Sequence, residues 1–254
     1  NQDSPYNAKC PKVGATNCYT GCIATAMAQV MNYFQYPASF PAIAAYTTTL
    51  SPQPISVEAL PGLSDFAWGS LKETYSPDDI DDNIAYLMRY CGQSVKMSYG
   101  TASSSTYEAY VPTALKSIFG YKSANFVDRS QYSSKGWDEL IYTELANNRP
   151  VIYNGQSSGG GHEFVCDGYD GYGYYHINWG WGGYQDGYFL LSALNPDEGG
   201  IGASSTSDGY VLKQNAVVNI KTTEASPEIL KAILYEFTYN EDTSKLVVAY
   251  YNVT

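Results

Sequence analysis

The hydrophobic pattern of this chain changes at Pro150. Before Pro150, apolar residues recur at spacings of three and four, as they do along one face of an α-helix. After it, short runs rich in valine, isoleucine and tyrosine are separated by turns that contain glycine and aspartate, which is typical of antiparallel strands. Helices followed by an antiparallel sheet indicate an α+β fold.

The first part is predicted to contain four helices. The clearest is Ile23–Phe34, and a second follows a Ser76 cap, ends at Gly92, and places Ile80 and Cys91 on its core face. The other predicted elements, two helices and then five strands, are Val111–Phe119, Trp137–Leu145, Val151–Tyr153, Glu163–Cys166, Tyr174–Asn178, Tyr188–Leu191 and Ala216–Ile220.

The length of 254 residues fits one large domain with a short appendage. The segment TTEASP at 222–227 has the composition of a linker. We therefore expect a domain over residues 1–221, followed by a linker and the start of a truncated β-rich extension over 222–254, which is too short for a stable sandwich.

Composition excludes several classes of function. The chain has 25 acidic and 14 basic residues, which argues against nucleic-acid binding. It contains no apolar run of about 18 residues, so we expect no membrane span. With two histidines and no CxxC pair, we expect no structural metal site.

The five cysteines are an odd number, so at least one thiol cannot pair within the chain. Cys22 lies in the first turn of a predicted helix, where the helix dipole favours a thiolate. His162 follows three glycines that permit close backbone approach, and a strand follows it. The pattern fits a Cys–His nucleophilic pair, and a buried structural thiol fits Cys22 equally well.

Other candidates are weaker. His176 lies in mid-strand between bulky residues and is predicted to be structural, and Cys18 lies before the helix and lacks its dipole. Cys91 and Cys166 follow core-facing patterns, and a Cys10–Cys18 disulfide is left open. The GQSSG segment at 155–159 matches a serine nucleophile elbow, but no helix can begin in the glycines after it.

The NWGWGG segment at 178–183 is the most unusual stretch of the chain. It fits a tight hairpin held by aromatic packing. A functional interpretation places an indole ring or the Asn178 amide beside His162, where it would orient the imidazole and shield it from water.

Four segments together resemble the streptopain family of secreted bacterial cysteine peptidases. They are TGCIATAMAQVM at 20–31, GGHEFV at 160–165, HINWGWGG at 176–183 with DGYF at 186–189, and NQDSPYN at 1–7, which is similar to the mature start of that family. The resemblance runs from Asn1 to about Lys221. Two features depart from it: relatives often carry a small apolar residue in place of Glu163, and streptopain has no counterpart of the tail.

The resemblance implies a papain-like fold and a catalytic site. Cys22 would be the nucleophile, and His162 the general base and acid. Gln2 would donate to the oxyanion together with the backbone N–H of Cys22. Trp179 would take the place of the asparagine that neighbours the histidine in papain. The substrate would contact Ser105, Gly161 and Trp181.

The resemblance also implies the biology. It predicts a secreted or cell-surface bacterial endopeptidase and virulence factor that cleaves proteins or peptides with an apolar residue just upstream of the cleaved one. It predicts a zymogen inhibited by an N-terminal prodomain, no metal or cofactor, and action as a monomer. The alternative is an inactive papain-like binding module that uses its 26 tyrosines as a protein or glycan surface.

Overall fold

The computed structural model describes residues 1–50, 54–197, 199–201, 203, 208–222, 233–240 and 245–252. The chain divides into two compact units, Asn1–Thr222 and Thr223–Thr254. In the second unit, β11 (Ile233–Asn240) pairs with β12 (Lys245–Asn252) as an antiparallel hairpin. The assignment of residues 222–254 to a larger β-rich extension stays a prediction.

The first unit combines four α-helices with a six-stranded sheet among its described residues. The helices are α1 (Cys22–Phe34), α2 (Asp82–Ser94), α3 (Val111–Ser117) and α4 (Ser134–Ala146). The sheet strands are β5 (Ser123–Asp128), β6 (Val151–Ser157), β7 (Gly160–Tyr169), β8 (Tyr175–Asn178), β9 (Gly187–Phe189) and β10 (Leu212–Lys221). Shorter elements are β1 (Lys12–Val13), β2 (Thr16–Asn17), β3 (Tyr46–Thr47), β4 (Ser56–Val57), η1 (Trp68–Ser70), η2 (Glu108–Tyr110) and η3 (Arg129–Gln131).

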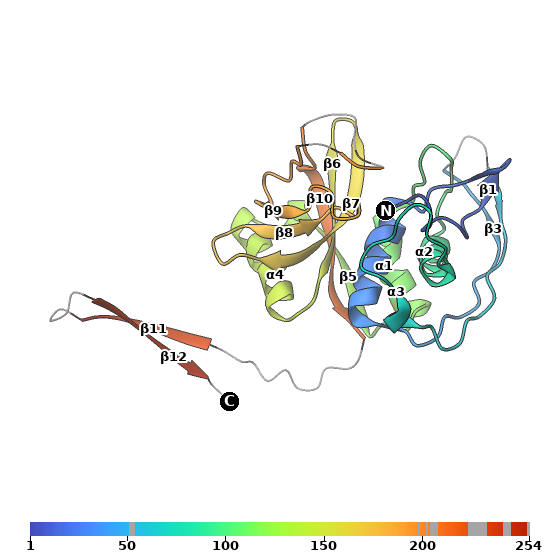
Figure 1. Cartoon of the computed structure of the whole chain (residues 1–254). Helices are drawn as coiled ribbons and strands as arrows, with labels where there is room; N and C mark the ends of the chain where they lie inside the picture. The colour runs from blue at the N-terminus through green and yellow to red at the C-terminus, as the bar shows by residue number, and fades with distance from the viewer. Residues whose placement is uncertain are drawn as a thin grey trace. The chain divides into compact units, whose positions relative to one another are not determined.

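The sheet is antiparallel throughout, in the order β5-β10-β6-β7-β8-β9. In Figure 1, α1, α2 and α3 gather on one side of the sheet and α4 lies on the other. The predicted α+β architecture is therefore confirmed. The prediction missed β5, whose SANFVD sequence has only a short alternating pattern.

Alternation along the central strands divides the core in two. Val217, Ile152 and Val165 are opposite one another on β10, β6 and β7. We call them the apolar row, and they pack with the core of α1, α2 and α3. Their neighbours in sequence point to the opposite face, where Tyr153 and Phe164 pack with α4. The sheet thus lies between two apolar cores.

The second helix begins later than the sequence predicts. Asp81 caps α2, because its Oδ1 accepts hydrogen bonds from the backbone N–H groups of Asn83 (2.8 Å) and Ile84 (3.2 Å). Ser76 instead closes a turn with Asp79. Placing Ile80 on the core face was wrong, because its side chain is 94% exposed.

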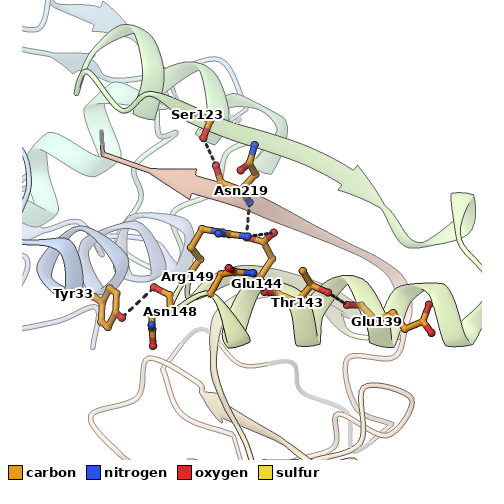
Figure 2. A network of polar contacts seen from close by, with 9 residues as sticks. Tyr33, Ser123, Glu139, Thr143, Glu144, Asn148, Arg149 and Asn219 are labelled. Carbon is orange, nitrogen blue, oxygen red and sulfur yellow. Dashed lines mark hydrogen bonds and ion pairs between the residues drawn. The ribbon is translucent and has the colours of Figure 1, made fainter. Parts of the chain in front are cut away.

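A buried ion pair fixes α4 against the sheet (Figure 2). Arg149 Nε lies 2.7 Å from Glu144 Oε2, and the same oxygen accepts from the backbone N–H of Asn219 on β10 at 2.9 Å. Beside this pair, the hydroxyl of Tyr33 on α1 donates to the carbonyl of Asn148 at 3.1 Å. The Tyr33 hydroxyl thus connects the end of α1 to the segment between α4 and β6.

No helix among the described residues is long and apolar enough to cross a membrane.

Candidate active site

The nucleophile candidate, Cys22, is the first residue of α1 and is partly exposed. Gly21 precedes it with φ of 88°. A Cβ at Gly21 would also lie 2.6 Å from the Met97 side chain and 3.2 Å from the carbonyl oxygen of Ser104. Only glycine fits both the conformation and the space, so this turn places Cys22 at the N-terminus of the helix.

The predicted base, His162, is buried on β7. Its Nε2 lies 2.9 Å from the backbone carbonyl oxygen of Trp179. Because a carbonyl oxygen only accepts hydrogen bonds, we assign the ring proton to Nε2. Nδ1 is buried and has no hydrogen-bond partner among the described residues. This tautomer leaves Nδ1 able to take up a proton.

Side chains hold the loop that presents the Trp179 carbonyl. The backbone N–H of Trp179 donates to Asp186 Oδ1 at 2.9 Å. Asn178 Oδ1 accepts from Gln29 Nε2 of α1 at 2.7 Å and from the backbone N–H of Gly180 at 2.9 Å. The Asn178 amide therefore connects the loop to α1. One interpretation of the sequence placed this amide beside His162 to orient the imidazole, but the structure shows no such hydrogen bond among the described residues.

An aromatic wall, formed by Trp181, Trp179, Tyr210 and Phe164, surrounds the imidazole. The ring of Trp181 stacks on His162 with a centroid distance of 5.0 Å and an interplanar angle of 23°. Trp179, Tyr210 and Phe164 lie 5.4–6.4 Å from the imidazole centroid. The four side chains are buried, so they shield one side of the imidazole from water.

The helix that begins with Cys22, α1, packs against β7, the strand that carries His162. The backbone N–H of Glu163, the residue after His162, lies close to the Cys22 sulfur and acts to lower the pKa of the thiol. The backbone N–H groups of Cys22 and Ile23 act in the same direction on this pKa. The sulfur thus lies near the strand position next to His162, and the three N–H groups favour a thiolate.

Burial acts on both groups in the direction of the neutral form. Together with the charge of Glu163, it raises the pKa of the Cys22 thiol to about 11. Burial also lowers the pKa of His162 to about 4, although the hydrogen bond to Trp179 acts to raise it. A thiolate forms most easily when the imidazole takes the proton, because the net charge of the site is then unchanged.

A cleft with a volume of about 520 Å³ opens beside Cys22. Three further residues named from the sequence line it: Gln2, Ser105 and Gly161. The remaining predicted residues, His162, Trp179 and Trp181, are buried and are not among the described residues that line the cleft. Trp181 was expected to contact substrate, yet it is 5% exposed and packs on the imidazole.

The positions of Gln2 and Ser105 limit what each can offer a ligand. Gln2 Nε2 donates to the carbonyl of Ile201 at 2.9 Å, which fixes the amide beside Cys22. The backbone N–H and carbonyl of Ser105 are both paired with Ser98. Ser105 therefore presents its exposed side chain to the cleft, while its backbone groups are occupied.

The weaker candidates lie elsewhere. His176 Nδ1 is 2.5 Å from Asp167 Oδ1 on a partly exposed part of the sheet. The GQSSG segment continues from β6 through a turn into β7, with no helix after it. All five cysteines are free, including Cys10 and Cys18. Within the described part of the chain, no cluster of three or more residues could hold a metal ion.

Sequence reasoning missed four residues that shape this site. Gln29 and Asp186 position the Trp179 loop, and Asn154 and Glu108 line the cleft. Gln29 follows Cys22 by seven residues, so helical spacing places both on one side of α1. The positions of Asn154 and Glu108 depend on strand register and on a loop, neither of which the local pattern specifies.

Comparison with known proteins identifies the family. A family model described as the peptidase C10 family matches residues 1–189. The chain belongs to the peptidase C10 family. This C10 chain is 39% identical to streptopain of Streptococcus pyogenes serotype M28 over 241 residues, covering 87% of this chain and 60% of streptopain. It therefore spans less than two thirds of that relative.

Another relative of this C10 chain is the thiol protease/hemagglutinin PrtT of Porphyromonas gingivalis. The two are 34% identical over 226 residues, covering 87% of this chain and 26% of PrtT. Similarity to solved structures confirms the papain-like fold. Active wild-type interpain A cysteine protease of Prevotella intermedia has a TM-score of 0.73 and 32% identity, covering 85% of this chain and 89% of that chain.

A second similar structure is a cysteine-to-alanine mutant of a prointerpain A fragment from the same organism. Its TM-score is 0.68 and its identity is 30%, covering 89% of this chain and 70% of that chain.

Proposed function

We propose that this C10 chain is a cysteine endopeptidase with Cys22 as nucleophile and His162 as general base and acid. The observation that carries the proposal is the hydrogen bond from His162 Nε2 to the Trp179 carbonyl, which leaves the buried Nδ1 without a proton. A ring fixed in this way, on the strand that packs against the helix whose first residue is Cys22, is suited to removing the thiol proton.

The acylation step needs both residues. His162 Nδ1 takes the proton of Cys22, and the sulfur attacks the scissile carbonyl carbon, so that a C–S bond forms and the carbonyl oxygen becomes an oxyanion. The C–N bond then breaks, and Nδ1 gives its proton to the leaving amine. The product is a thioester between Cys22 and the acyl part of the substrate.

Gln2 and the backbone N–H of Cys22 are the proposed oxyanion donors. Gln2 lines the cleft beside Cys22, and its amide has a second N–H besides the one bonded to Ile201. Loss of one such donor typically costs about 2.7–4 kcal/mol of transition-state stabilisation.

Deacylation uses the same imidazole. Nδ1 removes a proton from water, the hydroxyl adds to the thioester carbon, and the C–S bond breaks. The sulfur then regains the proton from Nδ1 as the acid product leaves. The aromatic wall supports both steps, because it holds the ring in one orientation through proton uptake and release.

We propose protein or peptide substrates that lie extended in the cleft and contact Ser105 and Gly161, with Trp181 acting through the imidazole it stacks on. We further propose that the protein is secreted by a bacterium as a monomeric zymogen and that an N-terminal prodomain inhibits it. The similarity to prointerpain A supports the zymogen part of this proposal. Residues 1–221 would form the catalytic domain.

Casein hydrolysis by purified chain tests the proposal. We expect hydrolysis that an epoxysuccinyl inhibitor abolishes and that is lost in Cys22→Ala. Cys10→Ala makes the same change at a buried cysteine that does not line the cleft, and it should retain activity. Wild-type activity in Cys22→Ala would reject this nucleophile, and a folded wild-type chain without hydrolysis would favour the binding module.

A further inference from the structure

A row of polar side chains crosses the sheet next to the apolar row. Asn215 on β10 is opposite Asn154 on β6, which is opposite Glu163 on β7. Each lies two residues along its strand from a member of the apolar row, so alternation places all three on the face that packs against α1. We call these three residues the polar row.

The polar row lies in the part of this face that borders the cleft. Asn154 lines the cleft together with Cys22 and with Glu108 of η2. Glu163 is 2% exposed, and its own backbone N–H lies close to the Cys22 sulfur. A substrate side chain that reaches this row therefore belongs to a residue close to the scissile bond.

Hydrogen bonds within the group formed by the polar row and Glu108 use amide donors of the two asparagines. They leave several oxygen acceptors of the polar row without a partner among the described residues. Asn154 Nδ2 donates to Glu163 Oε2 at 2.8 Å, and Asn215 Nδ2 donates to Glu108 Oε1 at 2.9 Å. Three buried oxygens have no hydrogen-bond partner among the described residues: Asn154 Oδ1, Asn215 Oδ1 and Glu163 Oε1. Buried acceptors without a donor are unfavourable, so the arrangement calls for a ligand that donates.

The charge of the group specifies what kind of donor fits. Burial raises the pKa of Glu163 well above its usual range, and the charge of Glu108 acts in the same direction. The hydrogen bond from Asn154 acts to lower this pKa but does not offset burial. No basic side chain lines this cleft in the described part of the chain. Burial and the charge of Glu108 both disfavour a negative charge at Glu163. An arriving cation would favour its ionised form and supply the missing N–H donors.

We propose that the polar row and Glu108 form a specificity subsite that binds the ammonium or guanidinium group of a substrate lysine or arginine near the scissile bond. The proposal rests on the proposed peptidase function and names a substrate class for it. It also gives a role to Glu163, the residue at which the sequence departs from the streptopain pattern.

Matched peptide substrates test the subsite. In one series of fluorogenic peptides, a single lysine is placed in turn at each of four positions, two before and two after the scissile bond. In a second series, uncharged norleucine replaces the lysine at the same positions. At one of these positions, we expect kcat/KM for the lysine peptide to exceed that for the norleucine peptide about tenfold or more, as for a charge-assisted hydrogen bond.

Two variants separate the subsite from general effects on the fold. Glu163→Gln keeps the shape but removes the charge, and should bring the lysine-to-norleucine ratio to about one. Glu139→Gln makes the same change on an exposed part of α4, and should leave the ratio as in wild type.

The outcomes distinguish the two proposals. Cleavage of the norleucine peptides with no lysine preference at any position would overturn the subsite alone, as would a preference that persists in Glu163→Gln. Failure of folded wild-type chain to cleave either series, or equal cleavage by Cys22→Ala, would overturn the proposed function itself.

Discussion

The imidazole of His162 is held by the main chain of Trp179 rather than by its side chain: Nε2 lies 2.9 Å from the Trp179 carbonyl oxygen. The indole of Trp179 is 6.4 Å from the imidazole centroid, farther than the indole of Trp181 at 5.0 Å. The orientation of the imidazole therefore depends on the side chains that fix the Trp179 loop. These are Asp186 and Gln29.

Gln29→Leu should impair catalysis without contacting substrate. It removes the 2.7 Å hydrogen bond to Asn178 that connects the Trp179 loop to α1. We expect kcat to fall roughly tenfold to a hundredfold with little change in KM, because a small misplacement of a catalytic group is enough for such a loss. Steady-state kinetics check this, with exposed Gln131→Leu as the control. Unchanged kcat in a folded Gln29→Leu variant would contradict a role for this bond.

Gln2→Ala should lower kcat by about a hundredfold to a thousandfold, as expected for loss of one oxyanion donor. Gln2 is 4% exposed beside Cys22, so thermal unfolding must first establish that the variant folds. A selective effect on kcat, with alkylation of Cys22 at the wild-type rate, would identify oxyanion stabilisation. A change confined to KM would instead indicate that Gln2 only binds substrate.

Gly200→Ala should disturb the aromatic wall. A Cβ at Gly200 would lie 2.8 Å from the Cβ of Trp181 and would also meet its ring, which stacks on His162. We expect a loss of about 1–3 kcal/mol of unfolding free energy and reduced kcat. Gly69→Ala is the control, since nothing lies within 4 Å of the added methyl group there. Equal melting temperatures and activities in the two variants would count against the wall.

The acid limb of the pH–rate profile should lie near pH 4. His162 acts as a base only when Nδ1 is unprotonated, and burial lowers its pKa from 6.5 to about 4. Activity should therefore persist at pH 5 and fall as the pH drops through about 4. The pH dependence of kcat/KM reports this pKa in the free enzyme. An acid limb near 6.5, in a chain still folded at that pH, would contradict a desolvated imidazole.

The same shift affects stability. Between pH 4 and 6.5 the unfolded chain binds a proton at His162 that the folded chain does not bind. The contribution of His162 to the unfolding free energy is therefore present above pH 6.5 and is lost as the pH falls toward 4.

Much of the site follows from local sequence patterns. The spacing from Ile23 to Phe34 defines α1 to within one residue and places Cys22 in its first turn. The glycines before His162 lie at the turn that starts β7, as expected for a strand that approaches the cleft. Residue type, periodicity and turn chemistry are sufficient for these features.

Other features of the fold and the site depend on competition between alternative helix caps or on packing between residues far apart in the sequence. Ser76 and Asp81 can each cap a helix, and the structure uses Asp81, which no local rule decides. Gly92 seemed a terminator, but α2 continues through it to Ser94. The missing side chain at Gly92 instead makes room for Tyr99. The acceptor for His162 is a main-chain carbonyl, and such a group has no sequence signature.

The central claim is that His162 activates Cys22, and alkylation of the folded chain with iodoacetamide at mildly acidic pH, followed by peptide mapping, tests it most directly. We predict that Cys22 is labelled much faster than buried Cys18. We expect His162→Ala to shift this labelling to alkaline pH, because burial and the charge of Glu163 raise the pKa of the thiol when no imidazole takes its proton. Labelling of Cys22 no faster than that of Cys18, or an unchanged pH profile in His162→Ala, would contradict the account.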